Sequence, residues 1–198
     1  MARTIAKDYG EKRGLILKAA ARVFADVGYD RASVNQVAEA CAISKANIYH
    51  YYASKDEILF AILETHLRAL RDRIFGLSLD GLSPAKKLHT TVEEILLAYR
   101  GADNEHKVQA MGLEPLPKDQ QQILKGYQRE LIAFLSAIVR DVAPEVFAED
   151  DTKLRAVTMS IFGMLNWFYM WNNNADNAAR AEYAALLSTL TLSGIEGL

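Results

Sequence analysis

The segment SVNQVAEACAISKANIYHYY, residues 33–52, carries the strongest structural signal in the chain. Ser33 followed by Gln36 has the spacing of a capping box, in which the serine caps a helix start and the glutamine reaches back. A second helix can start at Ser44, only a few residues after the first helix ends. The segment therefore predicts two short helices, 33–41 and 44–49, joined by a tight turn, which is the spacing of a helix-turn-helix.

The second of these helices exposes Ser44, Lys45, Asn47, Tyr49 and His50, as a helix that enters the major groove of DNA would, while Ala46 and Ile48 are small or buried. Lys45 can contact a guanine edge or a phosphate, and Asn47 can pair with an adenine edge. Four further side chains are better placed to hold phosphates: Tyr49, His50 and the helix-start residues Ser33 and Lys55. Tyr51 and Tyr52 are expected to pack beneath the helix pair.

The rest of the chain also reads as helix, and the predicted fold is all-α with about nine helices. Ser54 and Glu57 form a second capping-box pattern at the start of a helix that continues to Phe75. Apolar residues recur at the helical period in five later segments, around 84–99, 104–111, 118–142, 153–171 and 178–192. We expect a three-helix DNA-binding domain at 9–56, a linking helix at 54–75 and a C-terminal domain at 76–198.

The charge is unevenly distributed along the 198 residues, although the net charge is only -2. Residues 1–55 hold nine Lys and Arg against five Asp and Glu, whereas the remainder holds 14 basic and 20 acidic residues. A basic N-terminal part on an acidic body is typical of a protein that binds a polyanion with one end. Chance clustering of surface charge remains the alternative on this evidence alone.

Composition predicts a cytoplasmic protein. No window approaches the roughly 18 apolar residues of a membrane helix, and the polar start lacks a secretory signal. The single cysteine, Cys41, cannot form an internal disulfide, in agreement with a reducing compartment.

The chain carries none of the common catalytic or nucleotide-binding motifs, so we do not expect an enzyme. The four histidines have no metal-ligand spacing, and neither a metal site nor a cofactor is expected.

These residues together resemble the tetracycline-repressor (TetR) family over roughly residues 12–67. The similarity is clearest in four stretches: ILKAAARVFADVGY at 16–29, VNQVA at 34–38, ISKANIYHYY at 43–52 and SKDE at 54–57. Ala46, Ile48 and Tyr52 replace the glycine, leucine and phenylalanine common in the family. The resemblance implies a dimeric regulator, expected to repress, that binds a palindromic double-stranded DNA operator. It gives this DNA-contacting set: Ser33, Ser44, Lys45, Ala46, Asn47, Tyr49, His50 and Lys55.

In the C-terminal part, the family resemblance implies a helical pocket for a small-molecule effector and a homodimer interface on the last two long helices. The stretch IFGMLNWFYMW, residues 161–171, looks like one found in members that respond to acyl-CoA thioesters. The expected ligand-binding residues are Tyr99, Met111, Tyr127, Phe134, Asn166, Trp167 and Trp171. The expected dimer interface comprises Leu165, Phe168, Tyr183, Leu186, Leu187 and Leu190. The alternative for residues 161–171 is a row of apolar residues that serves only the core and the interface. The effector could instead be a hydrophobic drug or a free acid, and the alternative to a regulator is a helical adaptor protein.

Overall fold

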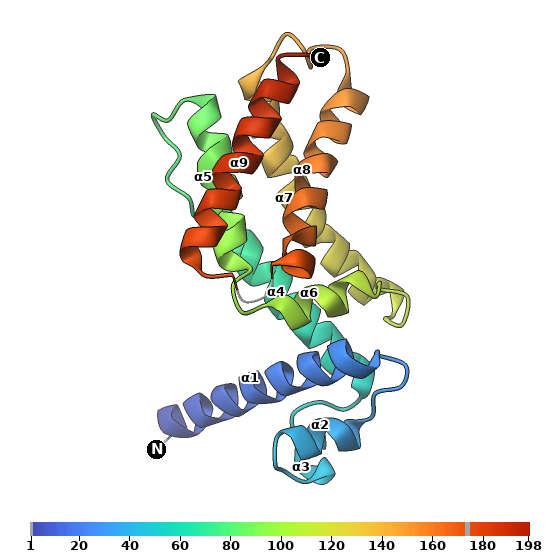
Figure 1. Cartoon of the computed structure of the whole chain (residues 1–198). Coiled ribbons are helices and arrows are strands. Elements are labelled where there is room, and N and C mark those ends of the chain that lie inside the picture. Colours follow the sequence, from blue (N-terminus) through green and yellow to red (C-terminus); the bar gives the residue numbers. More distant parts are fainter. Residues whose placement is uncertain (1, 173–174) are drawn as a thin grey trace. The chain divides into compact units, whose positions relative to one another are not determined.

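The computed structural model describes the backbone of residues 2–172 and 175–198, and the side chains within these ranges from Tyr9 onward. Nine helices and no strand are found there, which confirms the all-helical prediction (Figure 1). The helices are α1 (Ala2–Val27), α2 (Val34–Ala40), α3 (Lys45–Tyr49), α4 (Lys55–Phe75), α5 (Pro84–Ala98), α6 (Asp103–Ala110), α7 (Lys118–Val142), α8 (Asp151–Trp171) and α9 (Asn177–Ile195).

The chain divides into two compact units. Their boundaries are not the single boundary between residues 75 and 76 that the sequence suggests for the C-terminal domain. The N-terminal unit comprises Met1–Leu67 and Asn104–Leu124, and the C-terminal unit comprises Arg68–Asp103 and Lys125–Leu198. α4 and α7 therefore contribute residues to both units, while nearly all of α6 belongs to the N-terminal unit.

Local signals explain the helix ends of the N-terminal unit. α1 ends at Val27, and Gly28 follows with a φ of 85°, which favours glycine because a side chain is strained there. The backbone nitrogen of Glu57 donates to Ser54 Oγ at 3.0 Å, and Glu57 Oε2 accepts from the nitrogen of Ala53 at 2.6 Å. The second capping pattern is thus present with one difference, because Glu57 bonds Ala53 and not Ser54. The core of this unit includes Phe24, Val37, Ile48, Leu59 and Leu63.

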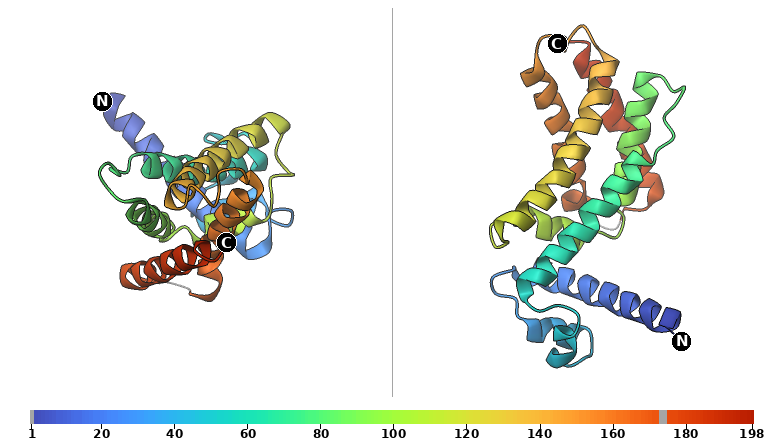
Figure 2. Two further views of the ribbon diagram at one scale, coloured as in Figure 1. Left: turned by 90° about the horizontal axis from the view of Figure 1, so that it is seen from above. Right: turned by 180° about the vertical axis from the view of Figure 1, so that it is seen from behind.

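The C-terminal unit is a bundle in which α5, α7, α8 and α9 lie alongside one another (Figure 2). Its core joins residues of all four helices, among them Leu96, Leu135, Leu165 and Leu187. Arg180 of α9 is 2% exposed and lies within this unit. Its guanidinium donates to the carbonyl oxygens of Leu96 and Ala175 at 3.0 and 3.2 Å, which ties the end of α5 to the segment before α9. Burial lowers the Arg180 pKa.

Among the described residues, no helix is long and apolar enough to cross a membrane. The same part of the chain contains no group of three or more His, Cys, Asp or Glu side chains that could hold a metal ion.

Candidate DNA-binding and effector sites

The two short helices of the helix-turn-helix are both capped as the sequence predicts. Ser33 Oγ accepts from the backbone nitrogen of Gln36 at 3.3 Å, and Gln36 Oε1 accepts from the backbone nitrogen of Ser33 at 2.8 Å. Ser44 Oγ accepts from the nitrogen of Asn47 at 3.2 Å. Each serine hydroxyl therefore fixes the start of its own helix, which leaves neighbouring backbone N–H groups directed outward for an anion.

The turn between α2 and α3 is tight because Ala42 adopts a left-handed conformation, with φ of 54°. This conformation costs a non-glycine residue about 1–2 kcal/mol. The nitrogen of Ile43 donates to the carbonyl of Ala38 at 3.0 Å, which closes the turn. No local pattern in the sequence marks Ala42 as the residue that bears this strain.

α3 exposes nearly all of its side chains. Ile48 is 0% exposed and anchors the helix in the core of the N-terminal unit. The exposed residues are Lys45, Ala46, Asn47, Tyr49 and the C-cap His50. Lys45 Nζ lies 5.9 Å from the centre of the Tyr49 ring, so a positive charge and an aromatic ring share one exposed face. This face offers the hydrogen-bonding and cationic groups that a DNA groove requires.

Lys55 has a different position from the one expected of a phosphate clamp. Its Nζ donates to the carbonyl oxygens of Tyr29, Asp30 and Ala32 at 2.9, 3.3 and 3.1 Å. An ammonium group has three protons, so these bonds use all of its donors. The expected phosphate contact is therefore corrected: Lys55 holds the loop between α1 and α2. Its partners lie 23 to 26 residues away, beyond any local sequence pattern.

Two contacts that the sequence did not predict fasten α1 to the residues after α3. The Tyr9 ring stacks on Tyr51 with centroids 4.8 Å apart. Arg13 Nε donates to the hydroxyl of Tyr52 at 3.3 Å, and the guanidinium lies 5.0 Å from the centre of that ring. Tyr52 is 1% exposed, so it packs beneath the helix pair as expected.

Four of the expected effector residues lie in the C-terminal unit and are at least half-buried or hydrogen-bonded there. The hydroxyl of Tyr99 donates to Asn166 Oδ1 at 2.8 Å, and burial raises the Tyr99 pKa. Tyr127 lies under the guanidinium of Arg71, 5.3 Å from the ring centre. Phe134 packs against Phe75 with centroids 5.1 Å apart.

Of the other three expected effector residues, Met111 lies outside the C-terminal unit, and Trp167 and Trp171 lie on the exposed surface of α8. Met111 belongs to the N-terminal unit, where it lines a cavity with Tyr29 and Leu59. Trp167 and Trp171 are 61% and 57% exposed, so among the described residues their side chains are not enclosed. Their spacing of four residues correctly predicts that both indoles lie on one face of a helix. That face is on the surface of α8.

The expected dimer residues divide into two groups. Leu165, Phe168 and Leu187 are 0 to 1% exposed, because they fill the core of their own unit, and their assignment to a dimer surface is wrong. Leu186 and Leu190 are 53% and 56% exposed on α9. Tyr183 is half-buried, and its hydroxyl donates to the carbonyl of Met164 at 3.2 Å.

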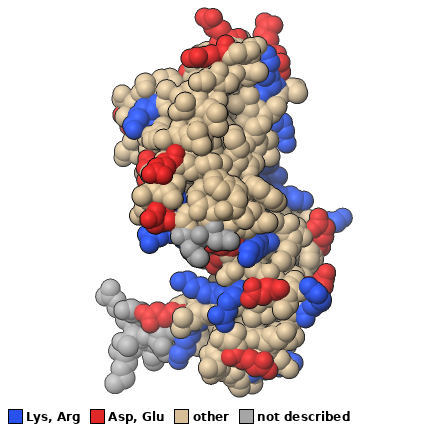
Figure 3. All heavy atoms as spheres, in the orientation of Figure 1, with Lys and Arg blue, Asp and Glu red and all other residues tan. Residues whose placement is uncertain are grey.

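The outer surface of α8 and α9 is unusually free of charge. No Asp, Glu, Lys or Arg occurs in residues 156–172 or 183–195. Figure 3 shows this as a broad area without charged atoms over α8 and α9. Exposed apolar residues on it are Met159, Trp167, Met170, Trp171, Leu186 and Leu190.

Comparison with known families agrees with this architecture. Residues 16–62 match the family described as "Bacterial regulatory proteins, tetR family", and residues 81–195 match "Tetracyclin repressor-like, C-terminal domain". This chain belongs to the TetR family.

Similar TetR-family proteins match over nearly the full length. A solved TetR-family regulator from Bordetella parapertussis is 32% identical, with TM-score 0.85, covering 94% of this chain and 96% of that one. The regulator PfmR from Thermus thermophilus is 27% identical, with TM-score 0.77 and coverages of 90% and 97%. The transcriptional repressor NicS of Pseudomonas putida is 24% identical over 92% of each chain. Two other curated relatives match over only 31% and 26% of their own length.

Membership of the TetR family makes this chain a DNA-binding transcriptional regulator and not an enzyme. The two regions that match the family models coincide with the DNA-binding and C-terminal helices of the structure. The first contains the helix-turn-helix, and the second contains α5, α8 and α9.

Proposed function

We propose that this TetR-family regulator is a homodimeric repressor that binds a palindromic operator through α3 and is released by a small effector. The observation that carries the proposal is the exposure of α3, where only Ile48 turns inward. Two copies of such a helix can enter successive major grooves about 34–36 Å apart. Binding to chromosomal DNA also requires the cytoplasmic location expected from the composition.

Within this proposal, the α3 residues divide the work of recognition. Lys45 and Asn47 read base edges, while Tyr49 and His50 contact phosphates. Ala46 is small enough to let the helix approach the groove. Ser33 and Ser44 act through the capped helix starts, whose backbone N–H groups favour a phosphate. Lys55 contributes by ordering the loop between α1 and α2.

The charge-free surface of α8 and α9 supports a homodimer. A monomer would leave Trp167, Leu186 and Leu190 in water, each more than half exposed. A groove of about 290 Å³ runs between α8 and α9, lined by Ala156, Leu190 and Gly194 of the charge-free segments and also by Lys153. In a two-fold dimer this surface would meet its own copy, which buries the apolar side chains and fixes the distance between the two DNA-binding helices.

For the effector, the acyl-CoA proposal rests on the segment around Asn166. Oδ1 of Asn166 accepts from Tyr99, which leaves the amide NH₂ group as a donor for a thioester carbonyl. Tyr127 and Phe134 supply apolar and aromatic surface in the same unit for an acyl chain. Trp167 and Trp171 are assigned to the dimer surface instead. A hydrophobic drug or free acid is the second candidate, because the same apolar residues would receive either.

The test begins by selecting bound sequences from a random DNA pool, since the operator is unknown. We expect a palindromic consensus, and mobility shifts on it should show two protomers per site. A panel of acyl-CoA thioesters is then added, with the matching free acids as controls. Release by a thioester alone supports the acyl-CoA effector, and release by free acids replaces it. The absence of any enriched DNA sequence would contradict the proposed function itself.

A further inference from the structure

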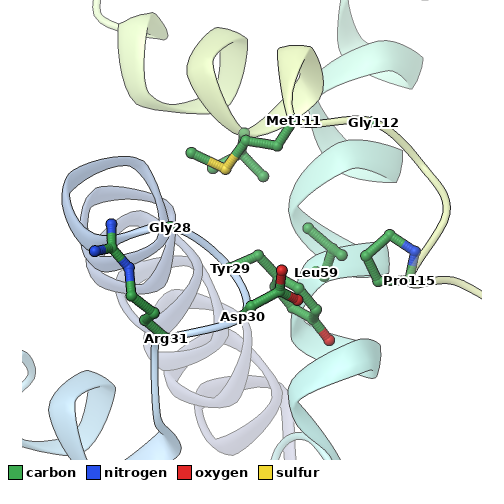
Figure 4. Close-up of a pocket in the computed structure, with 9 residues that line it drawn as sticks. Gly28, Tyr29, Asp30, Arg31, Leu59, Met111, Gly112 and Pro115 are labelled. Atoms are coloured by element: carbon green, nitrogen blue, oxygen red, sulfur yellow. The ribbon is translucent and has the colours of Figure 1, made fainter.

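A cavity of about 430 Å³ lies within the N-terminal unit, and none of the effector residues of the C-terminal unit lines it (Figure 4). Its walls are the loop Gly28–Arg31, Leu59 of α4, Val108 of α6, and Met111, Gly112 and Pro115 from the segment between α6 and α7. The volume is in the range of small-molecule sites.

One wall of the cavity is held rigidly. Lys55 Nζ bonds three carbonyl oxygens of the loop and lies 4.3 Å from the centre of the Tyr29 ring. The Tyr29 hydroxyl is hydrogen-bonded to Asp56, and Phe24 packs edge-on against the Tyr29 ring at 5.4 Å. A ligand would therefore not have to order this wall, which lowers the entropic cost of binding.

The lining combines apolar surface with two charged side chains, Asp30 and Arg31. Leu59, Val108, Met111 and Pro115 provide the apolar part. In Figure 4 the Asp30 carboxylate extends from the loop toward the middle of the cavity, whereas Arg31 runs along its edge beside Gly28.

One further contact bears on the sign of the charge that fits. Arg31 Nε donates to the carbonyl of Val27 at 2.7 Å, so this side chain is turned back on the end of α1. A positive group in the cavity therefore meets the Asp30 carboxylate, and charge-assisted hydrogen bonds to carboxylates are among the stronger polar contacts.

We propose that this cavity is a binding site for a small organic amine with an apolar or aromatic body, with Asp30 as the counter-charge. The site is separate from the effector site proposed for the C-terminal unit. The ligand would touch the loop that Lys55 holds, and Lys55 is the first residue of the helix that follows the DNA-binding helices. Occupancy should therefore alter operator affinity, a consequence that rests on the proposed function.

The experiment uses the full-length protein without DNA, so that it does not depend on the regulator function. Phenethylamine is titrated while the backbone amide resonances of Gly28, Leu59 and Gly112 are followed by NMR. The uncharged 2-phenylethanol and the anionic 3-phenylpropionate serve as ligands of similar size. We expect saturable shifts at these three residues with the amine, and binding weaker by about tenfold or more with the other two.

Variants locate the site. Asp30→Asn should weaken amine binding about tenfold, and Met111→Trp should abolish it by filling the cavity. Asp26→Asn, an exposed carboxylate on α1 outside the lining, should leave binding unchanged. Native-like spectra of each variant exclude misfolding. Equal binding of 2-phenylethanol, shifts confined to other residues, or full affinity in Asp30→Asn would each overturn the proposal.

Discussion

The hydroxyl of Tyr99, at the end of α5, donates a 2.8 Å hydrogen bond to Oδ1 of Asn166 on α8. Tyr99 is 5% exposed, so its hydroxyl has little access to water. Removing it with Tyr99→Phe should lower the free energy of unfolding by about 0.5–1.5 kcal/mol. Urea denaturation of both proteins gives this difference. Tyr49→Phe, at an exposed ring, is the control and should leave stability unchanged.

Lys45→Ala should reduce operator affinity. An equal loss for every DNA sequence would mean that Lys45 contacts a phosphate, whereas a loss that depends on one base pair would mean that it contacts a base edge.

Asn47→Ala should cost about 1–3 kcal/mol of binding and relax the preference at one base per half-site, if Asn47 reads a base. Fluorescence anisotropy with operator variants measures both effects. Lys86→Ala, at an exposed residue of α5, is the control for lost positive charge. For the wild type, the log–log salt slope should be on the order of -5 or steeper, and a flat response would count against α3.

Leu190→Asp should convert the dimer to monomers, because it places a charge in the middle of the uncharged surface of α8 and α9. Sedimentation velocity at micromolar concentration measures this, together with retained helical circular dichroism. Ile123→Asp, which replaces another exposed apolar residue at 47% exposure, should leave the dimer intact. A wild-type protein that sediments as a monomer would remove the basis of the proposed interface.

Lys55→Met keeps the apolar stem of the side chain but removes all three hydrogen bonds to the loop. We expect the free energy of unfolding to fall by about 1.5–3 kcal/mol, the range for bonds to charged groups. Thermal and urea denaturation measure this loss, and Lys45→Met on the exposed face is the control. Unchanged stability combined with weaker DNA binding and a shallower salt slope would instead make Lys55 a phosphate contact.

Stability should fall in mild acid because of His66. Burial lowers its pKa from 6.5 to about 4, and its ring packs edge-on against His106 at 4.9 Å. The unfolded chain therefore takes up this proton before the folded protein does. The stabilising effect is complete above about pH 6.5 and is lost as pH falls toward 4, by up to about 1.4 kcal/mol per pH unit.

Urea denaturation between pH 4 and 8 measures this slope. His66→Gln should flatten it over that interval. His89→Gln, at a residue on α5 paired with Glu93, should retain it. If the two variants behave alike, other groups govern the acid response.

The helices and most of their ends follow from the sequence alone, because they depend on neighbours within one turn. The capping box of Ser33 and Gln36 and the cap at Ser44 both form as predicted. The exposed face of α3 could also be predicted, since Ile48 is its one large apolar residue and so had to turn inward. Recognition of the TetR family followed from these same local patterns.

Which apolar face of α8 and α9 lies inside depends on tertiary packing. Both helices carry apolar residues on several sides, so periodicity could not separate Leu187, which is buried, from Leu186 and Leu190, which are exposed. Packing of α9 against α5 makes that choice. The role of Lys55 was equally hidden, because its three acceptors lie in a loop more than 20 residues earlier and meet its ammonium only after folding.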